Sequence, residues 1–220
     1  MINRYDILKY ISQREDGEMP QENERLVSVT DVIRTAIRDC GADEAEYDSV
    51  NVTDLNEREK RLAERWAMDR DCWIPFENIF SLGVPGPSGS ESDTYISKEG
   101  YVFKSNNLMH CHDSILIFLE RTILYNMLFP DSAYTFIGFA GFEGRSIFPV
   151  VRQRHIKGGK PAKQNEIDCY MSAIGFDKIE EGKYKFDKLV VSDLFPKNVL
   201  KDVTGDMFVI DVEINLEDIA

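Results

Sequence analysis

The spacing of apolar residues changes near residue 73, and this change constrains the fold more than any other feature of the 220-residue chain. Before it, apolar side chains recur at helical spacing in residues 3–13, 28–40 and 54–71. After it, short runs of β-branched and aromatic residues are bounded by glycine, proline and aspartate. A change of this kind predicts a group of helices followed by an α+β domain.

The expected organisation is an N-terminal helical accessory region, residues 1–72, and an α+β domain, residues 73–220. Two helices are expected in that domain, at residues 113–129 and 163–174. The expected strands are residues 78–82, 94–97, 101–104, 134–139, 147–152, 189–192 and 207–210. Aromatic residues at 66, 73 and 76 are suited to packing the N-terminal helices onto the first sheet.

The charge of the chain excludes some classes of partner. It carries 39 acidic and 26 basic residues, a formal net charge of -13, which is opposite to what contacts with a phosphate backbone need. We therefore expect no nucleic acid partner. Residues 1–99 hold 22 acidic and 12 basic side chains, so the acidic N-terminal half is a candidate surface for a protein partner, whereas residues 145–201 hold 7 acidic and 12 basic ones.

The expected location is the cytoplasm. The four cysteines have no CxxC spacing, and the first residues lack the basic and apolar regions of a secretory signal. The most apolar segment, residues 114–129, is interrupted by Glu120, Arg121 and Asn126. That pattern suits a helix buried in protein better than one in a membrane, so no membrane partner is expected.

Three polar residues near the C-terminus have a spacing that suits phosphoryl transfer. An apolar strand leads to Asp193, Asn198 follows five residues later, and a second apolar strand ends at Asp211. Phosphoryl transfer needs a carboxylate near the attacking hydroxyl and hard oxygen ligands for magnesium. The alternative is structural, because aspartate and asparagine at this spacing are also common in turns.

A glycine-bearing segment lies upstream, with Gly83, Gly86 and Gly89 between two expected strands and Lys104 at the end of the next one. A glycine hairpin can lie over a triphosphate, and a lysine on the neighbouring strand can reach its oxygens. The same residues also suit an ordinary loop. The sequence has no G-x-x-x-x-G-K-[ST] run, which excludes a P-loop, and no G-x-G-x-x-G that opens a helix after a strand.

Glu120 and a nearby run of possible metal ligands each have two interpretations. Glu120 lies within an apolar helix, where a carboxylate needs a partner, and Lys104 is the candidate; an exposed stripe is the alternative. The run from His110 to Asp113 holds four possible metal ligands, but adjacent side chains diverge. Asp113 is therefore expected to be the N-cap of the following helix.

Taken in order, the glycine hairpin, the Val-Phe-Lys strand, the glutamate helix, the Asp-x4-Asn loop and the Ile-Asp strand resemble the protein kinase superfamily. The resemblance is closest to the compact kinase-like domain of polyvalent proteins of phages and mobile elements. It is carried by residues 140–153, by 170–176 and by Val191-Ser192-Asp193-Leu194-Phe195-Pro196-Lys197-Asn198-Val199-Leu200. It covers residues 73–217 and leaves the N-terminal helices unexplained.

The resemblance implies binding of ATP with Mg²⁺ and a role for each matching position. Lys104 would bind phosphate, with Glu120 as its helix partner, after the glycines of the hairpin. Asp193 would be the catalytic base, Lys197 a cation for the γ-phosphate, and Asn198 and Asp211 the magnesium ligands. The adenine hinge would be Gln153, Arg154, His155 and Ile156.

The departures from the family pattern leave three functions open. Val191-Ser192 replaces the usual His-Arg, Asp211-Val212-Glu213 replaces Asp-Phe-Gly, and the chain ends nine residues after Asp211. The expected fold is thus a compact, C-terminally truncated protein-kinase-like domain with an N-terminal helical region. It is expected to be an ATP-dependent phosphotransferase, a pseudokinase, or a structural or interaction protein of a mobile element.

Overall fold

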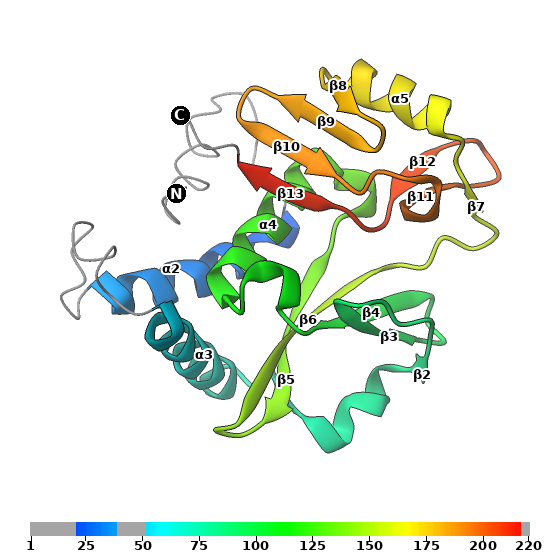
Figure 1. Cartoon of the computed structure of the whole chain (residues 1–220). Coiled ribbons are helices and arrows are strands. Elements are labelled where there is room, and N and C mark those ends of the chain that lie inside the picture. Colours follow the sequence, from blue (N-terminus) through cyan, green and yellow to red (C-terminus); the bar gives the residue numbers. More distant parts are fainter. Residues whose placement is uncertain (1–20, 39–51, 217–220) are drawn as a thin grey trace. The chain divides into compact units, whose positions relative to one another are not determined.

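The described residues of the computed structural model, 21–38 and 52–216, divide into two units (Figure 1). The N-terminal unit contains those within 19–123 and 134–155. The C-terminal unit contains residues 124–133 and those described after residue 155. Helix α4 (Ile115–Leu128) contributes to both. The chain therefore passes between the units more than once.

A six-stranded sheet is the frame of the N-terminal unit, in the order β1-β5-β6-β4-β3-β2. β1 pairs with β5 in parallel, and the other neighbours are antiparallel. The strands are β1 (Trp73–Pro75), β2 (Val84–Pro85), β3 (Ser92–Ile96), β4 (Tyr101–Asn106), β5 (Thr135–Phe142) and β6 (Ser146–Arg154). Gly138 permits the β1–β5 approach, because a Cβ there would lie 2.0 Å from the carbonyl oxygen of Cys72.

The expected strand at residues 78–82 is wrong. This segment belongs to a 3-10 helix, Phe76–Leu82. Phe76 and Ile79 are spaced by the three residues of one 3-10 turn; Ile79 belongs to a core cluster with Tyr95 and Val150, and Phe76 packs against that cluster. Phe80 is 64% exposed. The apolar run thus packs on one side only, as a short helix does.

The two N-terminal helices belong to the N-terminal unit. They are α2 (Glu24–Arg38) and α3 (Val52–Asp69), while the expected helix at residues 3–13 lies outside the described residues. Trp66 of α3 packs against Phe136 and Phe139 of β5, with ring centroids 6.2 and 6.5 Å apart. This is the packing role expected for Trp66.

The N-cap of α4 is Ser114, and the expectation of Asp113 is wrong. The Ser114 hydroxyl accepts a hydrogen bond from the backbone N–H of Ile117 at 3.2 Å. Asp113 has a left-handed backbone, φ 62°, and its carboxylate pairs with Lys60 of α3 at 2.7 Å. Glu59 of α3 adds a second contact, because its carboxylate accepts from the Ser114 hydroxyl at 2.7 Å. Helix α3 therefore fixes the start of α4.

The C-terminal unit contains two small antiparallel sheets, in the orders β13-β10-β9-β8 and β12-β11-β7. The strands are β7 (Lys160–Pro161), β8 (Asp177–Glu180), β9 (Lys183–Phe186), β10 (Leu189–Ser192), β11 (Val199–Lys201), β12 (Met207–Val209) and β13 (Glu213–Leu216). Helix α5 (Gln164–Ala173) precedes β8. None of the described helices is long and apolar enough to span a membrane.

Candidate functional site

Two nested strand pairs bring together the loop after β10 and the segment before β13 (Figure 1). The outer pair, β10 with β13, ends where Ser192 lies opposite Glu213. The inner pair, β11 with β12, continues to a backbone hydrogen bond of 2.8 Å from Ile210 N–H to the Asn198 carbonyl. The loop 193–198 and the segment 210–212 therefore lie side by side between the two pairs. The turn at residues 202–206 links the two strands of the inner pair, β11 and β12.

This arrangement gathers the three polar residues that the sequence singled out. Asp193 follows the last residue of β10, Asn198 precedes β11, and Asp211 lies between β12 and β13. The Asn198 amide nitrogen donates to the Asp193 carboxylate at 2.7 Å and to the Asp193 carbonyl at 2.8 Å. Both bonds use the amide nitrogen, which turns the amide oxygen of Asn198 away from Asp193. Lys197 lies 3.3 Å from the Asp193 carboxylate.

The backbone of Asp193 has an unusual conformation that its neighbours hold in place. Its φ is 60°, in the left-handed region that few residues other than glycine adopt. Leu194, which is fully buried, donates its N–H to the Gly182 carbonyl and accepts at its own carbonyl from Gln164 of α5. The chain is thus fixed directly after Asp193, whose side chain remains 41% exposed. A strained, anchored and exposed carboxylate is a candidate functional group.

A hydrogen-bonded network holds Gln164, the residue that donates to the Leu194 carbonyl. Gln164 donates to the Tyr184 hydroxyl at 3.1 Å, and Tyr184 donates to the Asp168 carboxylate at 2.5 Å. The hydrogen bond from Lys178, and then that from Tyr184, lowers the pKa of Asp168 below its usual value. Burial, followed by the bond to Asp168, raises the pKa of Tyr184. Both shifts favour the pair in which Tyr184 is protonated and donates to an ionised Asp168.

The glycine segment of the N-terminal unit forms a hairpin between β2 and β3. Gly86 N–H donates to the Thr94 carbonyl at 2.9 Å, and Gly89 N–H donates to the Ser92 carbonyl at 3.2 Å. A Cβ at Gly83 would lie 2.4 Å from the Ile96 carbonyl oxygen, so this position requires glycine. The three glycines thus shape one hairpin, and the role of that hairpin in phosphate binding stays a prediction.

Lys104 and Glu120 lie in the same unit, and each has a partner that the sequence did not reveal. Lys104 on β4 donates to the Tyr134 hydroxyl at 2.8 Å, and its ammonium lies 5.1 Å from the centre of the Tyr134 ring. The Glu120 carboxylate on α4 pairs with the Arg34 guanidinium of α2. Glu120 is fully buried, which excludes the exposed stripe considered as the alternative. A contact between Lys104 and Glu120 stays a prediction.

One signal for Arg34 was present in the sequence. The buried residues of α2 form a stripe at helical spacing, and Arg34 occupies a position on it; the stripe consists of Leu26, Val29, Thr30, Ile33, Arg34 and Ile37. A charged residue at such a position needs a buried partner of opposite charge. The position alone does not identify the partner. For Tyr134 we find no comparable signal.

The expected hinge residues lie where the chain leaves the N-terminal unit. Gln153 and Arg154 end β6 and lie opposite Val102 and Tyr101 of β4. His155 donates its N–H to the Gly100 carbonyl at 3.0 Å, and the C-terminal unit begins with Ile156. The position of this segment is that of a connection between units. Its contact with adenine stays a prediction.

Comparison with known protein families gives a match over most of the chain. A family model described as a serine/threonine/tyrosine kinase found in polyvalent proteins matches residues 56–218. The match begins within α3, so it includes part of the expected accessory region. No curated protein and no solved structure matches the chain.

Proposed function

Because the chain belongs to the family of serine/threonine/tyrosine kinases found in polyvalent proteins, we propose that it binds ATP with Mg²⁺ and transfers the γ-phosphoryl group to a hydroxyl acceptor. The observation that supports this proposal is that the backbone segments carrying Asp193, Asn198 and Asp211 lie side by side between two nested strand pairs. Convergence from three separate positions is more specific than the spacing of the residues along the sequence.

The donor set of these residues fits a hard divalent cation. The Asn198 amide oxygen and the Asp211 carboxylate are oxygen ligands of the kind that Mg²⁺ prefers. When bound with ATP, Mg²⁺ would neutralise the charge that develops on the phosphate oxygens. These two residues would hold it, and the hydrogen bonds from Asn198 to Asp193 would fix the distance between the metal ligands and the base.

The role of Asp193 would be to orient the acceptor and take its proton. The hydroxyl oxygen forms a bond to the γ-phosphorus while the bond from that phosphorus to the β,γ-bridging oxygen breaks, and ADP leaves. The proton of the hydroxyl passes to the Asp193 carboxylate and then to solvent. Lys197, 3.3 Å from this carboxylate, would supply positive charge to the phosphoryl group, and Lys104 would bind phosphate oxygens.

A second candidate function is nucleotide binding without turnover. It is favoured by Ser192, which occupies the position of the arginine that precedes the catalytic aspartate in the family pattern, and by Val212-Glu213 after Asp211. In this case the same residues would bind Mg²⁺ and ATP and the protein would act through a partner. The acidic N-terminal half remains the proposed surface for such a partner.

The test separates nucleotide binding from transfer. Wild type, Asp193→Asn, Asp211→Asn and the control Asp177→Asn, an exposed carboxylate on β8, are titrated with ATP with and without Mg²⁺ and followed by thermal shift. Transfer from γ-labelled ATP to acceptor peptides and to the protein itself is then measured. We expect Asp211→Asn to abolish the Mg²⁺-dependent shift. We expect Asp193→Asn to retain it and to lose transfer by about 100-fold or more.

The outcomes distinguish the two functions. Binding that depends on Asp211, without transfer by any variant, supports nucleotide binding without turnover. Absence of a Mg²⁺–ATP shift in the folded wild type contradicts both candidates. Transfer that persists unchanged in Asp193→Asn contradicts the role of this residue.

A further inference from the structure

A groove in the C-terminal unit begins at Asp193 and follows the strand pair β10–β13. Its volume is about 530 Å³, within the range of sites that bind small ligands or a few side chains. The lining residues come from the β8–β9 turn, from β10 and the start of the following loop, and from β13. They are Glu180, Glu181, Gly182, Lys183, Val190, Ser192, Asp193, Phe195, Glu213, Asn215 and Leu216.

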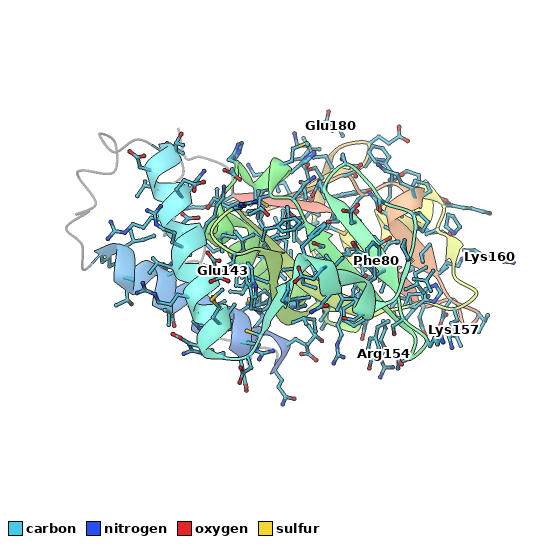
Figure 2. The ribbon with its side chains drawn as sticks, turned by 90° about the horizontal axis from the view of Figure 1, so that it is seen from below. Phe80, Glu143, Arg154, Lys157, Lys160 and Glu180 are labelled. Atoms are coloured by element: carbon cyan, nitrogen blue, oxygen red, sulfur yellow. The ribbon has the colours of Figure 1, made fainter. Side chains whose placement is uncertain are left out.

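The charge of the groove is negative. Its lining holds four carboxylates and one ammonium, Lys183, which pairs with Glu180 at 3.3 Å. Lys197 pairs with Asp193 at 3.3 Å, so the carboxylates still outnumber the ammonium groups by four to two. The negative charge is local, because residues 145–201 as a whole carry 12 basic and only 7 acidic side chains. The Glu180 side chain projects outward from the ribbon (Figure 2). A triphosphate is therefore a poor occupant of the groove, and a cation is a good one.

The wall of the groove beside Asp193 is preformed. A Cβ at Gly182 would lie 2.6 Å from the ring of Phe195, so with any other residue the ring or the turn would have to shift. The bond from Leu194 N–H to the Gly182 carbonyl, 3.0 Å long, ties the same turn to the loop of Asp193. Val190, Phe195 and Leu216 add apolar surface. The occupant therefore combines positive charge with apolar parts.

The shape favours an extended chain over a compact ion. Ser192 lies opposite Glu213, and Leu216 is three residues further along β13, so the groove extends roughly 10 Å from the position of Asp193. This length matches two or three residues of an extended peptide. We propose that the groove binds the basic residues beside the serine, threonine or tyrosine whose hydroxyl reaches Asp193. The proposal rests on the proposed function, since it makes Asp193 the site of transfer.

The test measures peptide binding in the absence of nucleotide. A fluorescein-labelled peptide with one serine flanked by arginines is compared, by fluorescence anisotropy, with the same peptide carrying glutamates. The variant Glu181→Lys reverses one charge of the groove, and Glu180→Lys repeats the test at a second position. The matched control is Asp177→Lys, which makes the same change of net charge at an exposed residue of β8 outside the groove. Thermal unfolding checks that all variants are folded.

We expect the arginine peptide to bind and the glutamate peptide to bind at least tenfold more weakly. Glu181→Lys should weaken binding of the arginine peptide about tenfold, and Asp177→Lys should weaken it less than threefold. Added salt should reduce the difference between the two variants. Equal effects of the two substitutions overturn the proposal, as does binding without charge preference. If spermidine displaces the labelled peptide as strongly as unlabelled peptide does, the groove recognises a polycation and the proposal of an extended peptide is contradicted.

Parallel titration with ATP and Mg²⁺ keeps the two proposals apart. Charge-selective peptide binding in a protein that shows no Mg²⁺–ATP shift supports the groove and contradicts the proposed function. Transfer to acceptors irrespective of flanking charge, with no effect of Glu181→Lys, supports the proposed function and overturns the groove.

Discussion

Arg34 and Glu120 form a buried ion pair that joins helix α2 to helix α4 across 86 residues of sequence. Their side chains are 10% and 1% exposed. Helix α2 precedes the part of the chain that matches the kinase family. Glu120 lies inside that part, and the resemblance makes it the partner of Lys104. An element outside the family match therefore supplies the counter-charge for a predicted site residue.

Removing one member of this pair should strongly destabilise the N-terminal unit. Arg34→Met leaves the Glu120 carboxylate without this buried counter-charge, and we expect a loss of about 3–5 kcal/mol in the free energy of unfolding measured with urea. The control Arg38→Met, exposed on the same helix, should cost under about 0.5 kcal/mol. Because the double variant Arg34→Met/Glu120→Leu removes both charges, it should recover part of the loss. Equal stabilities of Arg34→Met and Arg38→Met would contradict this account.

Gly182 offers a test of how closely the β8–β9 turn approaches the Asp193 loop. Gly182→Ala places a methyl group 2.6 Å from the Phe195 ring and strains a backbone with φ 75°. The control Gly205→Ala has a φ of 96° and nothing within 4 Å of the new atom. Both should lose about 1 kcal/mol from backbone strain. Only Gly182→Ala should lose about 1–3 kcal/mol more in urea unfolding and, if the groove is the acceptor site, weaken peptide binding. Equal losses in stability would show that the turn yields without cost.

Lys104 should contribute to ATP affinity through its charge. Lys104→Met is expected to weaken Mg²⁺–ATP binding at least tenfold in calorimetry, because a charged hydrogen bond to phosphate contributes about 1.5–3 kcal/mol. Tyr134→Phe keeps the ring under the ammonium and removes the hydroxyl, so a smaller loss of about threefold is expected. Lys98→Met, in the turn before β4, is the control. Unchanged affinity in Lys104→Met would refute the phosphate role.

The hydrogen bonds of Asp168 should make part of the free energy of unfolding depend on pH. The pKa of Asp168 in the folded protein lies below its ordinary value of 3.8, chiefly because Lys178 donates to its carboxylate. The stabilisation is therefore fully present above about pH 4 and is lost as the pH falls through the folded pKa. Wild type should be more stable than Asp168→Asn at pH 7, and the difference should shrink below pH 3.8. A difference that grows on acidification would contradict the sign of this shift.

The elements that the sequence predicted well are those with long, regular apolar patterns. Helices α4 and α5 and strand β10 lie where the patterns indicated, with ends within two residues of the expected ones. Several other strands of two to four residues, such as β1 and β7, were missed because they are defined by distant pairing partners rather than by their own sequence. The 3-10 helix at residues 76–82 was taken for a strand because its apolar run is too short to show a period.

For the candidate site, local spacing was informative and long-range pairing was not. The positions of Asp193 and Asn198 follow from a strand, a loop and five residues of spacing, all of which are local. The nesting that places Asp211 beside them depends on β13, a strand the sequence did not predict. The pairing of Arg34 with Glu120 likewise depends on how two separate helices pack, and the local spacing of residues in the sequence does not show this.

The division of the chain between the two units has a consequence for synthesis on the ribosome. Residues 124–133 belong to the C-terminal unit, yet β5 and β6, the strands that join β1 to β4 in the six-stranded sheet, follow them. A nascent chain that ends near residue 133 therefore exposes β1 and the free edge of β4 without their partners. Unpaired edges of this kind are prone to aggregate. Premature release at this point should yield an insoluble product, and the sheet becomes complete only after β6 has left the exit tunnel.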